Sequence, residues 1–258
     1  MELSTLSNRD KAEAIQNSIE TETLAAIGLI NPASYKQHNP NVATGLQAIL
    51  EIHEQMPMDK VYTNVVRKFQ DGDIGFVHVD YYLFEPTVAF DIHRFENGVS
   101  VEHWDNLQLN NRQLNKSGRT MTDGKTKATD HHKTASNKQL ARSFVQTVLI
   151  EGHTERLSSY FRADLLIQHN PHMGDGVQEF FSVLEQWKRE GKPQVYQTIH
   201  QVLGEGNFVL VLSEGYLHGV HVAFYDLYRI EDDRIIEHWD VIEEIPPTEK
   251  RKNDNGKF

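Results

Sequence analysis

Asp91 is the residue of this sequence best placed to move protons. It interrupts the apolar run "VAFDIHRF", and Asp226 interrupts the similar run "VAFYDLYRI". A carboxyl group among such neighbours loses hydration, which raises its pKa towards the range in which it can accept and return a proton near neutral pH. A structural ion pair with Arg94, or with Arg229 in the second run, is an equally good interpretation, although a spacing of three puts the two side chains on opposite faces of a regular strand.

The sequence Glu-His-Trp-Asp occurs twice, and each copy contains a histidine and an aspartate two residues apart. Side chains alternate between the faces of a strand, so His103 shares a face with Asp105, and Trp104 lies on the other face. His238 and Trp239 repeat this arrangement. A carboxylate can fix the tautomer of a histidine that acts as a general base. A hydrogen-bonded structural pair is the more common meaning of the pattern, and either face could line a cavity.

Further histidines extend the set of candidates. His78 lies in the apolar run "GFVHVDYY", where it could face the same interior as Asp91 or be a core histidine bonded to a backbone carbonyl. The loop sequence "QHNP" occurs in both halves and could bind a ligand carbonyl at the mouth of a cavity, or simply end a helix and turn the chain. Its polar residues are Gln37, His38 and Asn39 in the first copy and Gln168 and His169 in the second.

The sequence contains no motif for a metal or a cofactor. It has no cysteine, no His-Glu-x-x-His helix, no EF-hand loop and no glycine motif for phosphates or dinucleotides. The pair His131–His132 has no acidic or thiol partner at ligand spacing beside it. We therefore expect no metal site and an activity without a cofactor.

The charge and the start of the chain indicate the compartment. A formal net charge of −11 at pH 7 opposes a phosphate backbone, so nucleic acid is not an expected partner. The first residues lack the basic and apolar segments of a secretory signal, and no stretch approaches the roughly 20 apolar residues that span a bilayer. The absence of cysteine fits a reducing compartment. We expect a cytoplasmic protein that does not associate with membranes.

Matched blocks indicate that the chain is duplicated. Asp226 follows Asp91 by 135 positions, the two copies of Glu-His-Trp-Asp are also 135 positions apart, and the two copies of "QHNP" are 131 apart. Similar blocks in the same order are typical of a repeated domain. Residues 1–110 are expected to form the first domain and residues 136–247 the second. The intervening residues 111–135, rich in Lys, Thr, Gly and Ser, predict a flexible linker, and residues 248–258 a disordered tail.

Each half begins with helical periodicity and ends with strands. Ser7 and Ser136 can cap the first helix of each half, and a further helix follows Gly45 and Gly176. Runs rich in Val, Ile, Phe and Tyr then alternate with turns such as "ENG" and "EDD". This order predicts an α+β fold in which a curved antiparallel sheet wraps around the N-terminal helices of each domain.

The motifs "QHNP", "VAFDIHRFENGVSVEHWD" and "VAFYDLYRIEDDRIIEHWDVIEEIP" resemble the SnoaL-like polyketide cyclase family of the nuclear transport factor 2-like (NTF2-like) superfamily. The resemblance covers about residues 7–108 and 136–246. It implies two tandem cone-shaped NTF2-like domains, each with an apolar pocket. It also implies that the two domains pair as a pseudo-dimer within the chain, and it leaves further homo-oligomerisation open.

The resemblance further implies roles for individual residues. Asp91 would be the acid and base of an aldol-type reaction. The expected catalytic partners are His38, His78 and His103. The expected substrate-binding residues are Gln37, Asn39 and Trp104 in the first half and Gln168, His169, Asp226, His238 and Trp239 in the second. Leu212 stands where the first half has His78, so the first half is expected to be the active one.

Two functions remain open from the sequence. The first is a cofactor-independent lyase or isomerase of the cyclase type, acting on a small carbonyl or aromatic compound in an apolar pocket. The second is a non-catalytic pair of domains that binds a small ligand or mediates assembly. The enzyme requires Asp91 to line a cavity within reach of a histidine, whereas the binding protein would tie Asp91 to Arg94 or to a backbone donor.

Overall fold

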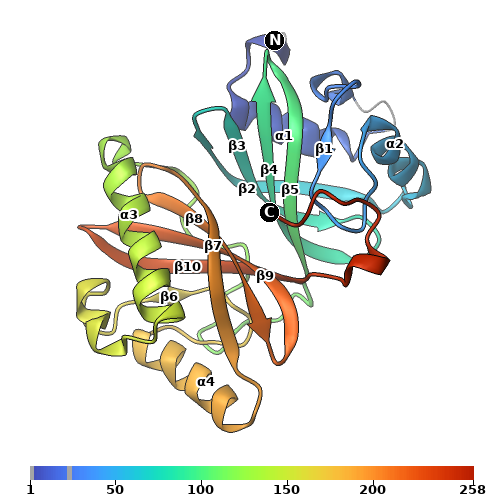
Figure 1. Cartoon of the computed structure of the whole chain (residues 1–258). Coiled ribbons are helices and arrows are strands. Elements are labelled where there is room, and N and C mark those ends of the chain that lie inside the picture. The colour runs from blue at the N-terminus through green and yellow to red at the C-terminus, as the bar shows by residue number, and fades with distance from the viewer. Residues whose placement is uncertain (1–2, 22–24) are drawn as a thin grey trace. The chain divides into compact units, whose positions relative to one another are not determined.

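The computed structural model describes residues 3–21 and 25–258. The chain divides into two compact units, one formed by Met1–Asn111 with Ile245–Phe258 and the other by Arg112–Glu244. Each unit has helices packed against a five-stranded sheet (Figure 1), which confirms the expected α+β fold. Within the described residues, no helix has both the length and the apolar character needed to cross a membrane.

The first unit begins with its helices and ends with a meander of strands. Strand β1 pairs in parallel with β5, and the other neighbours are antiparallel in the order β1-β5-β4-β3-β2. Its helices are α1 (Asn8–Ser18) and α2 (Leu46–Gln55), and its strands are β1 (Lys36–Gln37), β2 (Tyr62–Asp71), β3 (Ile74–Tyr82), β4 (Pro86–Glu96) and β5 (Val99–Leu109).

The second unit repeats this arrangement with the order β6-β10-β9-β8-β7, and β6 is again parallel to its neighbour. Its first helix continues into one stretch of π-helix over Val145–Ile150. Its helices are α3 (Thr134–Phe144) and α4 (Val177–Arg189), and its strands are β6 (Ile167–Gln168), β7 (Gln194–Glu205), β8 (Phe208–Leu217), β9 (Val220–Glu231) and β10 (Arg234–Glu244).

Local sequence explains where these elements begin and turn. Ser7 caps α1, because its side chain accepts a hydrogen bond from the Asp10 backbone amide. The hairpin between β4 and β5 uses Asn97 and Gly98, both with positive φ (50° and 87°), as tight hairpin turns require. The prediction that Ser136 caps the first helix of the second half is wrong. Helix α3 starts earlier, at Thr134, and Ser136 donates to the Lys133 carbonyl from inside the first turn.

The register of the sheet decides which side chains of β4 and β5 share a face. Asp91 lies opposite Asp105 on β5 and opposite Val77 on β3, and His93 lies opposite His103. Since directly opposite residues point to the same side of a sheet, these side chains share the inner face, which packs against α1. The second unit has the same register, with Asp226 opposite Asp240.

Residues 112–135 differ from the expected flexible linker because they pack on the second unit. Asn115 donates from Nδ2 to the Gln168 carbonyl at 2.7 Å, and Arg119 forms a two-pronged ion pair with Asp175. The segment is held by short polar side chains and backbone groups rather than by an apolar face. Hydrophobic periodicity does not detect such packing, and the composition is that of a linker.

The segment 248–258 differs from the expected disordered tail for the same reason. It packs on the first unit, where Asn253 donates to the Asn39 carbonyl at 2.7 Å and Asn255 donates to the Gln37 carbonyl at 2.8 Å. Asparagine side chains supply two donors and an acceptor each, so a short polar segment can be fixed without burying a large apolar side chain.

An arginine and a glutamate join the last two strands of each unit on the face opposite to the aspartate. Arg94 Nε lies 2.9 Å from Glu102 Oε2 in the first unit, where the side chains are 28% and 13% exposed. Arg229 Nε lies 2.5 Å from Glu237 Oε2 in the second, where they are 5% and 2% exposed. The repeated motif therefore forms a cross-strand ion pair that is much more deeply buried in the second unit.

We predict that Arg229→Met destabilises the protein by about 3–5 kcal/mol, because it leaves the Glu237 carboxylate buried without its partner. The matched change Arg94→Met should cost about 1 kcal/mol or less, because Glu102 is more hydrated. Urea unfolding of both variants, followed by circular dichroism, measures the difference. Equal losses of stability would contradict this account of the two pairs.

Candidate active site

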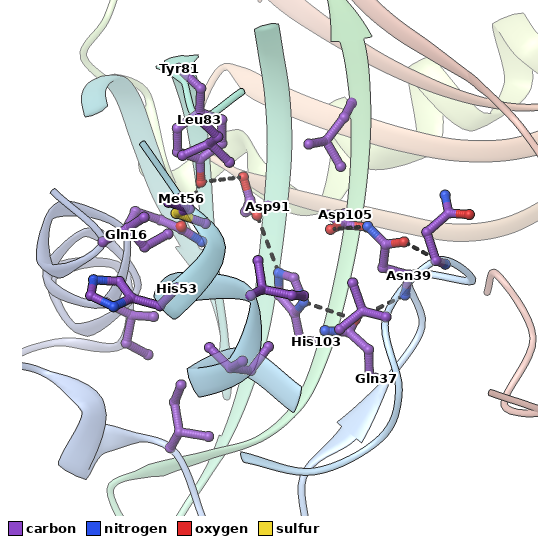
Figure 2. Close-up of a pocket in the computed structure, with 18 of the residues that line it drawn as sticks. Gln16, Gln37, Asn39, His53, Met56, Tyr81, Leu83, Asp91, His103 and Asp105 are labelled. Carbon is purple, nitrogen blue, oxygen red and sulfur yellow. Dashed lines mark hydrogen bonds and ion pairs between the residues drawn. The ribbon is translucent and has the colours of Figure 1, made fainter. Parts of the chain in front are cut away.

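The first unit encloses a cavity of about 410 Å³ between the helices and the inner face of its sheet (Figure 2). One end is aliphatic and the other end is polar. The aliphatic wall includes Ile15, Ile19, Ile27, Ile30, Ile49, Ile52, Leu83 and Leu107, and the polar end consists of Gln16, Gln37, Asn39, Tyr81, Asp91, His93, His103 and Asp105. An apolar cavity with a few converging polar groups is the usual form of a small-molecule site.

Asp91 is held at the polar end by a histidine and a tyrosine. Its Oδ1 lies 3.2 Å from His103 Nε2, and its Oδ2 lies 3.1 Å from the Tyr81 hydroxyl. Burial raises the pKa of this carboxyl group above its ordinary value, and the hydrogen bond and charge of His103 only partly oppose the rise. Arg94 pairs with Glu102 instead, so the alternative ion pair between Asp91 and Arg94 is wrong.

The tautomer of His103 is fixed by the "QHNP" loop. Gln37 Oε1 accepts the backbone N–H of Asn39 at 2.8 Å and lies 3.0 Å from His103 Nδ1. Because the backbone N–H can only donate, the atom facing His103 is the amide oxygen, and Nδ1 must carry a hydrogen. Nε2 can therefore accept a proton from Asp91 across their contact. Figure 2 shows this chain of contacts from Tyr81 to Gln37.

A second carboxylate, Asp105, lies beside this pair. Asn39 donates from Nδ2 to Asp105 Oδ2 at 2.8 Å, so the loop positions both members of the His-x-Asp sequence. Within the described residues, donor atoms of Asp91, His103 and Asp105 lie within 4.8 Å of one another. One imidazole and two carboxylates could hold a divalent metal ion such as Mn²⁺ or Zn²⁺. A proton held between Asp91 and His103 would reduce the negative charge of the two carboxylates as a metal ion would.

Two further polar groups at this end, His93 and Tyr81, are neutral. Burial lowers the pKa of His93 well below its ordinary value, and its ring contacts Gln16 Nε2 at 3.2 Å and Ser100 Oγ at 3.0 Å. Burial, with the nearby charge of Asp91, raises the pKa of Tyr81 well above its ordinary value. Tyr81 therefore keeps its proton and can only act as a donor to developing negative charge.

The structure does not bring the expected partners His38 and His78 to Asp91. The ring of His38 stacks on Trp104 (4.7 Å between centroids), and its Nε2 lies 2.8 Å from Glu102. These three side chains lie on the opposite face of β5 from His103, so Trp104 is also outside the cavity lining. His78 lies beside Val77, the residue opposite Asp91, and therefore points to the other face, where it contacts Phe90. Because side chains alternate along a strand, Trp104 and His78 lie on the face away from Asp91, and His38 stacks there on Trp104. None of the three lines the cavity.

Sequence reasoning missed Gln16, Tyr81 and His93. Gln16 follows Ile15 on the buried side of α1, so a polar residue within an apolar helical stripe was the available signal. His93 follows Asp91 by two positions and shares its face by alternation alone. Tyr81 could be found only from the register, because its face depends on how β3 pairs with β4.

The second unit repeats the polar network around Asp226. Asp226 Oδ1 lies 2.8 Å from His238 Nε2, and Gln168 Oε1 lies 3.1 Å from His238 Nδ1. Burial alone would lower the pKa of His238, but the hydrogen bond and charge of Asp226 raise it above its ordinary value. The tyrosine hydroxyl comes from another strand, because Tyr196 on β7 lies 3.2 Å from Asp226, whereas Tyr81 is on β3.

Aromatic rings fill the interior around Asp226. Phe224 stacks on Tyr196 (4.2 Å between centroids), and Tyr228 stacks on His238 (4.9 Å). The repeat offset of 135 places small Ala89 where the second unit has Phe224 and His93 where it has Tyr228. The expected ligand contacts His169 and Trp239 stack on each other at 4.6 Å on the opposite face. The divergence of the two copies therefore explains why the first has a cavity beside its aspartate.

Residues 141–238 match the SnoaL-like domain. The match lies within the second unit, and the first unit repeats the order and register of its strands. The match supports the expected SnoaL-like resemblance for the second half of the chain. No curated protein matches the chain.

Several solved structures are similar to one part of the chain. IdmH, titled "a putative polyketide cyclase from Streptomyces antibioticus", is 16% identical over 41% of this chain and 91% of its own, with a TM-score of 0.33. An NTF2-like protein of unknown function from Cytophaga hutchinsonii is 17% identical over 40% and 92%, with a TM-score of 0.35. A "putative ketosteroid isomerase from Kribbella flavida" is 16% identical over 45% and 84%, with a TM-score of 0.36. Sequence identities and TM-scores this low say nothing about a shared activity.

We predict that Asp91→Asn makes the protein more stable at pH 7. An asparagine can donate to His103 Nε2 and accept from Tyr81, so both hydrogen bonds survive without a buried ionisable group. Because the folded state raises the pKa of Asp91, its stabilising effect is present below the pKa of the unfolded chain and is lost as the pH rises. The advantage of the variant should therefore disappear near about pH 4.

Urea unfolding of both proteins between about pH 4 and pH 8 measures this advantage. A variant that is less stable than the parent at pH 7 would show that the carboxylate of Asp91 is a net stabilising group.

Proposed function

We propose that the first unit is a cofactor-independent acid–base enzyme of the lyase or isomerase type, acting on a small carbonyl compound. The observation that carries this proposal is Asp91, a buried carboxyl group of raised pKa at the polar end of a cavity, in contact with His103 and Tyr81. A carboxylate in such surroundings can remove a proton from a carbon atom next to a carbonyl group.

The proposed step needs one base and one donor. Asp91 takes the proton from the α-carbon, the C–H electron pair moves into an enolate, and the Tyr81 hydroxyl donates to the enolate oxygen. His103 Nε2 can hold the transferred proton, because Gln37 keeps the hydrogen of this ring on Nδ1. Return of the proton to another carbon is an isomerisation. Loss of a β-hydroxyl group from the enolate is a dehydration. Attack of the enolate carbon on a second carbonyl group of the same molecule is an aldol cyclisation.

The lining of the cavity limits the substrate. Its walls are mainly aliphatic, and two carboxyl groups, Asp91 and Asp105, lie at the polar end. A volume of about 410 Å³ is within the range of small-molecule sites. These features favour a mostly hydrocarbon compound with one carbonyl or hydroxyl group.

The second unit supports an alternative function, a non-catalytic site that binds a small ligand. The same contacts among Asp226, His238 and Gln168 exist there in an interior filled by aromatic rings. The network can therefore serve as a structural element of the fold. In this alternative, the first unit binds its ligand through shape and one hydrogen bond, without proton transfer.

We predict that the protein accelerates exchange of the α-protons of 2-tetralone, a small bicyclic ketone, in D₂O. Asp91→Asn should lower the rate by about 10²-fold or more, because the variant has no base. Asp226→Asn should retain the parent rate, because the interior of the second unit is filled. Proton NMR measures the exchange directly.

Three outcomes separate the two functions. Exchange that depends on Asp91 supports the enzyme, and exchange that survives Asp91→Asn contradicts the assigned base. Absence of exchange, together with saturable binding of the fluorescent phenol 2-naphthol to the first unit, would favour the binding protein.

A further inference from the structure

We propose that the C-terminal segment Asn253–Phe258 is part of the candidate active site of the first unit. It holds the "QHNP" loop from outside, and the loop in turn fixes the ring of His103 that contacts Asp91. Any effect of the segment on catalysis depends on the function proposed above. Its effect on the His103 ring can be measured without catalysis.

The segment occupies the backbone carbonyls of the loop one after another. Asn255 donates from Nδ2 to the Gln37 carbonyl at 2.8 Å and to Thr44 Oγ1 at 2.7 Å. Asn253 donates from Nδ2 to the carbonyls of Asn39 and Val42 at 2.7 and 2.8 Å. The Lys252 backbone amide precedes them and donates to the Pro40 carbonyl at 2.7 Å. A loop with the carbonyls of Gln37, Asn39, Pro40 and Val42 bound in this way has little freedom to move.

The end of the segment reaches side chains as well as backbone. The Gly256 carbonyl lies 2.9 Å from His38 Nδ1. Lys257 is 4% exposed, and its Nζ lies 3.8 Å from Asp105 Oδ1, at the polar end of the cavity. Lys252 itself lines the cavity. The segment therefore supplies the buried Lys257 beside Asp105, and the residue that precedes the segment lines the cavity.

The "QHNP" loop connects the C-terminal segment to His103 and Asp105. The carbonyl of Gln37 is bound by Asn255, and its side-chain oxygen sets the hydrogen on His103 Nδ1. Asn39 is bound through its carbonyl by Asn253 and positions Asp105 through its own side chain. If the loop shifts, Gln37 no longer faces His103, and the ring can take the other tautomer or rotate. Asn253 and Asn255 are therefore positioning residues, not catalytic ones.

The second unit is supported in the same way by residues from the middle of the chain. Asn115 donates from Nδ2 to the Gln168 carbonyl at 2.7 Å, as Asn255 does to Gln37, and the Thr120 carbonyl lies 2.8 Å from His169 Nδ1, as Gly256 does from His38. Asn115 follows the last strand of the first unit, whereas Asn255 follows the last strand of the second. Each unit is thus completed by the segment that follows the other unit's sheet. Repetition in both copies indicates that the support is a required part of the domain.

The experiment removes the segment and reads the ring of His103. A chain ending at Lys252 and the full-length variant Asn255→Ala are compared with the parent by long-range ¹H–¹⁵N NMR of the histidine rings, which reports the tautomer of each. We expect His103 to be a pure Nδ1–H tautomer in the parent and a mixture in both variants. We also expect binding of 2-naphthol to weaken about tenfold, equal to about 1.4 kcal/mol.

A matched control and a rescue separate this effect from general loss of structure. Asn115→Ala removes the corresponding bond in the second unit and should change the His238 signals while leaving His103 and 2-naphthol binding as in the parent. A synthetic peptide of residues 249–258, added to the truncated chain, should restore the His103 signals. If the truncated chain does not fold, Asn255→Ala alone decides the question.

An unchanged His103 tautomer and unchanged 2-naphthol affinity in Asn255→Ala would overturn the proposal. This result is independent of the proposed reaction, because neither measurement requires turnover. A shifted tautomer in a protein that exchanges no α-protons would support the role of the segment while contradicting the enzyme.

Discussion

The contact between Asp91 and His103 is the interaction on which the rest of the candidate site depends. A carboxyl group in an aliphatic interior is costly to ionise, and this cost raises its pKa. The cost is tolerable because His103 Nε2 can accept a proton from Asp91 and Gln37 fixes the hydrogen on the other ring nitrogen. The two strands that carry these residues, the "QHNP" loop and the C-terminal segment all contribute to holding one imidazole ring in one orientation.

The two units hold the same network in different surroundings. Both have the aspartate, histidine and glutamine in equivalent contacts, and both place a tyrosine hydroxyl on the aspartate, although from different strands. The first unit has Ala89 and His93 where the second has Phe224 and Tyr228. This exchange of small or polar side chains for large rings leaves room for a cavity beside Asp91 and packs aromatic rings around Asp226. The more deeply buried pair Arg229–Glu237 also fits a second unit with a structural role.

The segments outside the two sheets connect the fold to the site. Residues 112–135 and 248–258 have the composition of linkers, yet each supplies asparagines that bind the carbonyls of a "QHNP" loop. The first unit is therefore incomplete without the last residues of the chain. A domain boundary drawn at the end of β5 or β10 would cut through the support of the loop that positions His103.

The sequence by itself determined the repeated blocks and the α+β order of elements, and it singled out Asp91 and the pair His103 and Asp105 as candidates. These features follow from local patterns: a repeat offset, a period of two along a strand, and a charged residue in an apolar run. The tertiary structure decided which face of each strand is the interior, and it thereby removed His38, His78 and Trp104 from the site and added Gln16, Tyr81 and His93. Face and register depend on pairing between strands distant in sequence, and the polar segments pack through backbone carbonyls that every residue has, so no pattern of residue types could reveal them.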